Sequence, residues 1–119
     1  MTANLQLSEI KLARDRKTLF VTFGENKSVG LAAEFLRVES PSAEVQGHGA
    51  GQKKTPSGKR NVTIAGIEQV GNYAVKLLFD DGHSTGIFSW ALLQDYAVRQ
   101  ETLMSDYIAR LAERGLTRD

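Results

Sequence analysis

The sequence lacks cysteine altogether and holds only two prolines and two histidines. Without cysteine, the chain cannot form disulfides, use a thiolate as nucleophile, ligate an iron–sulfur cluster or build a cysteine-based zinc site. No apolar run approaches the roughly 20 residues of a membrane span, and the N-terminal stretch lacks a signal-peptide pattern. We therefore expect no membrane association and a cytoplasmic location.

An excess of charge of either sign is also missing, because 15 Lys and Arg residues balance 14 Asp and Glu residues and leave a net charge of +1. Such a balance gives no global attraction to nucleic acid or to a membrane surface. The length of 119 residues suits one domain with its own hydrophobic core.

Patterns of alternating or β-branched residues predict strands over residues 7–12, 18–23, 28–31, 62–70, 73–79 and 84–88. Gly71-Asn72 favours a two-residue hairpin between the fourth and fifth of these strands. A short helix is expected over residues 32–37, and a longer helical region begins at Trp90 with Ser89 as its N-cap. We expect a break near residues 100–102, a helix end at Gly115 and a frayed tail over residues 116–119.

An internal similarity relates residues 19–31 to residues 75–87, where Phe, Ser and Gly recur at equivalent positions. This similarity predicts two strand–turn–strand–helix units. The sequence therefore predicts an α+β fold with a mostly antiparallel sheet and a C-terminal helical extension.

The segment over residues 39–61 has no apolar periodicity and holds both prolines and four glycines. Between positions 46 and 60 it contains no acid but four cations, Lys53, Lys54, Lys59 and Arg60. Its glycines do not make a nucleotide-binding loop, since the flanking strand and helix and the required residues at positions 53 and 60 are missing. Two interpretations stay open: a solvated mobile loop, or a contact surface for anions or nucleic acid. The latter would have to work without aromatic stacking.

Catalytic and metal-binding groups are scarce. His48, His83 and either Asp80 or Asp81 would together make a two-histidine, one-carboxylate metal site. A serine nucleophile at position 42 or 89 would need a histidine base and a carboxylate, and no local pattern supplies them.

Residues 36–45, 67–75 and 79–90 resemble the gamma-butyrobetaine hydroxylase-like N-terminal domain family, and the resemblance covers residues 5–96. We therefore divide the chain into that domain over residues 1–96 and a helical extension of it over residues 97–119. The resemblance implies a non-catalytic accessory domain. In the hydroxylases this domain precedes an iron- and 2-oxoglutarate-dependent oxygenase domain and takes part in dimer formation. A related domain is joined to iron–sulfur carrier ATPases, and bacteria also carry it alone.

The resemblance also implies four zinc-ligand positions, three cysteines and a histidine, which are Ser40, Ser42, Val45 and His83 in this chain. Only the histidine is retained, so we expect the zinc site to be lost and no cofactor to replace it. His83 is then either a turn histidine hydrogen-bonded to Ser40 or Ser42, or a pH-sensitive or weak metal contact.

Three functions are consistent with these features. The first is a non-enzymatic accessory or protein-interaction domain for iron–sulfur or oxygenase partners, and a homodimer is also compatible with the sequence. The second is binding of nucleic acid or an anionic ligand through the basic loop, and the third is a small metal-dependent enzyme. The expected interaction surface comprises His48, Lys53, Lys54, Lys59, Arg60, Asp80, Asp81 and His83.

Overall fold

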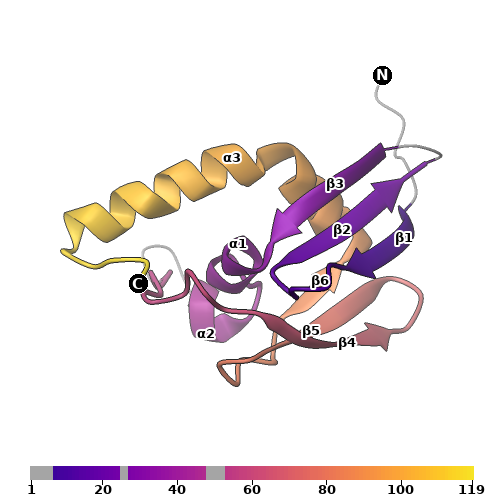
Figure 1. The fold of residues 1–119 in the computed structure, drawn as a ribbon, viewed down its shortest axis with the longest axis horizontal. Coiled ribbons are helices and arrows are strands. Elements are labelled where there is room, and N and C mark those ends of the chain that lie inside the picture. The colour runs from indigo at the N-terminus through magenta and orange to yellow at the C-terminus, as the bar shows by residue number, and fades with distance from the viewer. Residues whose placement is uncertain (1–6, 25–26, 48–52) are drawn as a thin grey trace.

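The computed structural model describes residues 7–24, 27–47 and 53–119. In chain order the elements are β1 (Leu7–Leu12), β2 (Thr18–Phe23), β3 (Lys27–Ala32), α1 (Ala33–Val38), α2 (Ala43–Gln46), β4 (Ile64–Val70), β5 (Ala74–Phe79), β6 (Ile87–Ser89) and α3 (Trp90–Glu113). The strands form two antiparallel three-stranded sheets, ordered β1-β2-β3 and β4-β5-β6, and the long helix α3 lies along one side of them (Figure 1). The predicted α+β fold is confirmed.

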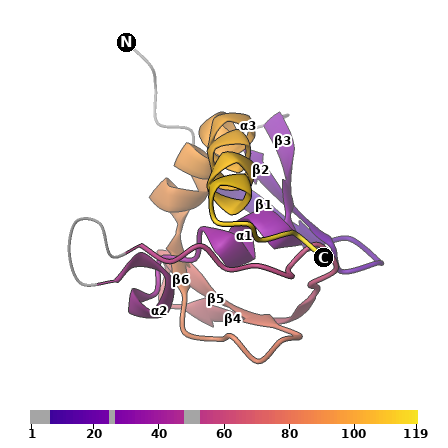
Figure 2. The ribbon, with the colours of Figure 1, turned by 90° about the vertical axis from the view of Figure 1, so that its left-hand side faces the viewer.

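The core lies where the two sheets, α1 and α3 meet. Figure 2, viewed along α3, shows α1 between α3 and the β4–β6 sheet. On β2 the alternation of the sequence buries Leu19 and Val21, while Phe20 between them is 40% exposed. Phe35 of α1 and Leu93 of α3 are fully buried in the same cluster. Each element therefore contributes one apolar face to a shared core.

The hairpin between β4 and β5 differs by one residue from the prediction. Its loop has three residues, because β4 ends at Val70, β5 begins at Ala74, and these two residues pair across the ladder. Tyr73 lies in the turn and is 59% exposed, while Gly71 adopts a positive φ of 55°. The predicted alternation along β5 holds from there, with Val75, Leu77 and Phe79 buried. The last strand is also shorter than expected, at Ile87–Ser89 rather than 84–88.

Helix α3 begins where the sequence predicts but does not break. Ser89 caps it, since its Oγ accepts a hydrogen bond of 3.1 Å from the Leu92 amide. The expected interruption near residues 100–102 is wrong, because one helix of 24 residues runs through that region and across the 96/97 division. At that point Gln100 bonds the edge of β3: its Oε1 accepts from the Ala32 amide and its Nε2 donates to the Gly30 carbonyl, each at 3.0 Å.

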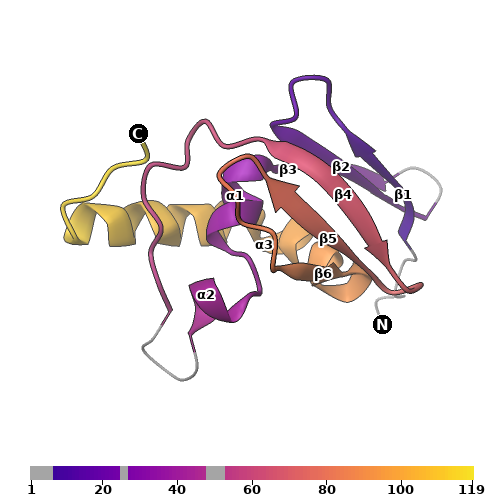
Figure 3. The ribbon, with the colours of Figure 1, turned by 90° about the horizontal axis from the view of Figure 1, so that it is seen from below.

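The expectation of a frayed C-terminal tail is also wrong. After Gly115 (φ 65°) the tail turns back and pairs with residues 53–60, which we call the basic segment. There Gly58 N donates to Thr117 O, and Arg60 N donates to Arg118 O. Figure 3 shows the tail beside this segment, which runs from near α2 to β4. The tail packs against the rest of the domain because its backbone groups and charged side chains bond to residues that are far away in the sequence.

The long segment expected as a loop contains a helical turn, α2, which the sequence does not predict. Lys54 N donates to the Val45 carbonyl at 2.7 Å, so the basic segment is attached to α2. Together α1, α2 and residues 53–60 gather at one end of the sheets, beside the turn that follows β5 (Figure 3).

Candidate functional site

Four polar side chains, Ser40, Ser42, Glu44 and His83, form a group that we call the histidine cluster. The first two and His83 are buried, whereas the Glu44 side chain is 62% exposed. His83 Nε2 lies 2.9 Å from Ser40 Oγ and 3.3 Å from Ser42 Oγ, and its Nδ1 lies 3.2 Å from Glu44 Oε2. Ser40 is fully buried and His83 is 6% exposed. The hydrogen bond expected between His83 and a serine of this segment is present.

The turn after β5 positions His83. Gly82 takes a φ of 92°, and the His83 amide then donates to Asp81 Oδ1 at 3.0 Å. Gly86 allows the two segments to approach, because a Cβ at this position would lie 2.3 Å from Ser40 Oγ. The glycine that recurs in the internal similarity is therefore required here by close contact.

The hydrogen-bond pattern determines how protons are arranged in the cluster. A carboxylate only accepts, so Nδ1 carries the proton and donates to Glu44, and Nε2 accepts from the Ser40 hydroxyl. Burial lowers the pKa of His83, with Arg37 acting in the same direction and the carboxylates of Glu44 and Asp81 opposing it. The neutral imidazole is the form that this environment favours.

The zinc that the resemblance implies does not fit these residues. Ser40 and Ser42 offer neutral hydroxyls, which already meet the imidazole, and Val45 offers a buried aliphatic side chain. Structural zinc takes four nitrogen or sulfur donors, and this chain supplies one of them at these positions. Within the described residues no three His, Asp or Glu side chains gather into a metal-binding group, and His48 lies outside those residues.

In the cluster a serine contacts a histidine and the histidine contacts a carboxylate, which is the arrangement that a serine nucleophile requires. The sequence did not reveal it, because the base and the carboxylate are not close to Ser42 in the chain. His83 and Glu44 supply that base and that carboxylate from the fold. A nucleophile must reach its substrate, however, and Ser40 and Ser42 are 0% and 7% exposed. The other serine considered, Ser89, is occupied as the cap of α3.

The cations of the expected interaction surface are largely paired within the molecule. Lys53 Nζ lies 2.6 Å from Glu39, Lys59 Nζ lies 2.6 Å from Asp81, and Arg60 bonds Asp119. Asp80 accepts a hydrogen bond from the Thr63 amide. Of the four cations, Lys54 alone has no carboxylate partner among the described residues, so the local charge is smaller than the sequence suggests.

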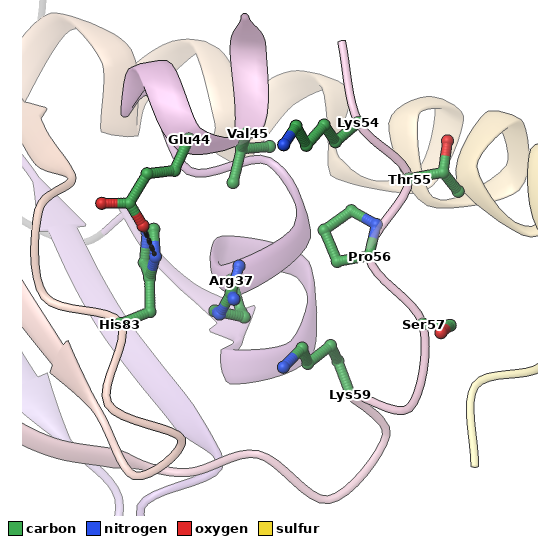
Figure 4. Close-up of a pocket in the computed structure, with 9 residues that line it drawn as sticks. All are labelled: Arg37, Glu44, Val45, Lys54, Thr55, Pro56, Ser57, Lys59 and His83. Carbon is green, nitrogen blue, oxygen red and sulfur yellow. Dashed lines mark ion pairs between the residues drawn. The ribbon is translucent and has the colours of Figure 1, made fainter.

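A cavity of about 590 Å³ lies beside the histidine cluster and is open to solvent. It is lined by Arg37, Glu44, Val45, Lys54, Thr55, Pro56, Ser57, Lys59 and His83 (Figure 4). In Figure 4 the guanidinium of Arg37 and the ammonium groups of Lys54 and Lys59 point into this space, whereas Thr55 and Ser57 point away from it. We call it the basic cavity; sequence reasoning missed Arg37 because its partners come from other segments.

Asp81 organises the cations of the basic cavity. Its Oδ2 accepts from Arg37 Nε at 2.8 Å and from Lys59 Nζ at 2.6 Å. Burial raises the pKa of Asp81, but the hydrogen bonds from Lys59, the His83 amide and Arg37 outweigh it and lower the pKa to about 2. Asp81 is thus ionised throughout the neutral range and holds two cations at the cavity wall.

The described fold defines an α+β domain with a cysteine-free polar cluster next to a basic cavity. The family model "Gamma-butyrobetaine hydroxylase-like, N-terminal" matches residues 10–94, and the chain belongs to this family. No curated protein matches the sequence. Within the described residues no helix is long and apolar enough to cross a membrane.

Solved structures support the same assignment. Two NMR solution structures are 49% and 44% identical to the chain, with TM-scores of 0.83 and 0.80. The alignments cover 98% and 99% of this chain and 92% and 90% of theirs. A crystal structure of a DUF971-family protein of unknown function from Acidithiobacillus ferrooxidans is 34% identical, with a TM-score of 0.62 over 76% of this chain and 90% of that one.

Proposed function

We propose that this protein is a non-catalytic accessory domain that acts by binding a protein partner, with iron–sulfur and oxygenase proteins as the partner classes. The observation that carries the proposal is the state of His83. Both its ring nitrogens are engaged by Ser40, Ser42 and Glu44, and the ring is buried, so it offers neither a base nor a ligand to a substrate. Binding is the role that such a site supports.

The family description points the same way, because it names the N-terminal part of hydroxylase-like proteins, which is a part that accompanies another domain. The proposed contact surface is the rim of the basic cavity, formed by residues 53–60 and the Asp80–His83 turn. Lys54 is exposed there and has no ion-pair partner among the described residues, which makes it available to a partner's carboxylate. The cytoplasm is the compartment we propose.

Affinity capture from native extract tests this proposal. Wild-type protein, Lys54→Glu and the matched control Lys11→Glu are immobilised; Lys11 is an exposed lysine on β1, outside the cavity. We expect proteins that are retained by wild type and Lys11→Glu and lost with Lys54→Glu. If every protein retained by the wild type is retained equally by Lys54→Glu, this surface is not the contact site.

Binding of nucleic acid is the second candidate, favoured by the cations around the cavity. It predicts affinity that falls steeply with salt concentration. A labelled oligonucleotide that shows no binding at low salt would end this alternative.

The third candidate, a metal-dependent enzyme, requires stoichiometric metal in the purified protein, and elemental analysis decides it.

A further inference from the structure

We propose that the basic cavity is a binding site for a small organic phosphate. This goes beyond the proposed function, because it needs no protein partner. The cations come from separate segments, with Arg37 on α1 and Lys54 and Lys59 on the segment that lines the other side of the cavity. Figure 4 shows all three directed into one space.

Arg37 is the central donor of this site. Its side chain is only 13% exposed, and its Nε is bonded to Asp81. Its Nη1 is enclosed and has no hydrogen-bond partner among the described residues. An enclosed charged donor without a partner is destabilising, so an acceptor that reaches it is favoured.

The charges at the wall favour a bound anion. Three cations face two carboxylates, Asp81 and Glu44. Asp81 is paired with Arg37 and Lys59. Glu44 bonds the neutral His83 and Thr85 and keeps its negative charge, so the cations exceed the carboxylates by one. A guanidinium presents a fork that matches phosphate oxygens, and lysines add point charges around it.

The volume and the lining of the cavity indicate which kind of organic phosphate fits it. About 590 Å³ lies within the range of roughly 300–1,000 Å³ that is typical of small-molecule sites. Val45 and Pro56 give part of the wall an apolar character, which suits the organic portion of a phosphomonoester. No Phe, Tyr or Trp is among the lining residues, and the one aromatic ring there, His83, is buried, so the wall offers no large stacking platform for a nucleobase.

NMR titration with inorganic phosphate and with β-glycerophosphate tests the inference, at pH 7.5 and constant ionic strength balanced with chloride. We expect saturable shifts of the amides of residues 37, 54, 55, 57–59 and 83, with a Kd of about 1 mM or below. Because the cavity exceeds the phosphate group, β-glycerophosphate should bind at least as tightly as inorganic phosphate. Absence of saturation with either probe, or exclusion of β-glycerophosphate, would overturn the inference.

Lys54→Gln should weaken binding at least about fivefold, the effect of losing roughly 1 kcal/mol of charge interaction. Lys11→Gln, with the same change outside the cavity, should bind as wild type does. Arg37→Lys keeps the charge but removes the fork and should also weaken binding. If it fails to fold, the Lys54→Gln result still decides.

The two proposals fail separately. Phosphate binding without any partner that depends on Lys54 leaves the ligand site standing and removes the proposed function. A Lys54-dependent protein partner without phosphate binding does the reverse.

Discussion

His83 shows how a single residue can carry a pH dependence. Burial lowers its pKa in the folded protein, whereas the unfolded chain keeps the ordinary value near 6.5. Below that value the unfolded state binds more protons, so stability falls as the pH decreases through the folded pKa. The charged groups around the ring are Arg37, Glu44 and Asp81, and the last of these stays ionised above its pKa of about 2.

We therefore expect the urea midpoint of the wild-type protein to decrease between pH 7.5 and pH 5. His83→Gln, whose amide can still donate and accept, should flatten this part of the profile. His48→Gln is the matched control and should keep the wild-type slope. Equal slopes for His83→Gln and wild type would contradict the assignment.

Ser40, Ser42 and Val45 lie at positions where the resemblance implies zinc ligands, and their side chains offer no thiolate. The triple variant Ser40→Cys, Ser42→Cys, Val45→Cys would complete a set of three thiolates with His83. We expect it to bind one zinc per chain and to lose thermal stability with EDTA, while the wild-type melting temperature stays unchanged. Adding His83→Gln to the triple variant should weaken its binding of zinc. Melting of the wild-type protein by chelator would show that our view of the cluster is wrong.

Among the elements, α3 is attached to the first sheet by one polar side chain in addition to its apolar packing. Gln100 makes two hydrogen bonds to backbone groups at the edge of β3, and it is partly buried there. These bonds also satisfy an edge strand that would otherwise present free amide and carbonyl groups.

Gln100→Leu should lower the free energy of unfolding by about 1 kcal/mol, because a partly buried backbone donor and acceptor lose their partner. Urea denaturation measures this loss. Gln94→Leu, on the same helix, removes an amide that makes no hydrogen bond to β3 and should cost clearly less. Similar losses for both variants would argue that the two bonds matter little.

At the scale of the whole molecule, the C-terminal tail joins segments that are far apart in the chain. Arg118 makes a bidentate contact with Glu34 of α1, at 2.8 Å and 2.6 Å, although the residues are 84 positions apart. Glu34 is 6% exposed, so its carboxylate depends on this partner. The tail also pairs with the segment that borders the basic cavity.

Arg118→Ala should therefore destabilise the protein by about 3 kcal/mol, because it leaves a nearly buried carboxylate unpaired. Arg114→Ala, which removes an exposed arginine without an ion pair among the described residues, should change stability by less than about 0.5 kcal/mol. Equal unfolding free energies for the two variants would mean that the tail contributes nothing to stability.

By itself the sequence determined the local structure: the strands from their alternation, the cap at Ser89, and the exclusion of cysteine chemistry. These features depend on neighbours within a few residues, and the chain shows them directly. Tertiary structure alone decided the rest, including the continuity of α3, the docked tail and the pairing of the basic segment. It also brought Glu44 to His83 and Arg37 to Asp81, contacts that span 39 and 44 positions. Such contacts depend on how the sheets and helices pack, and charge counted along the chain does not show which carboxylate each cation meets.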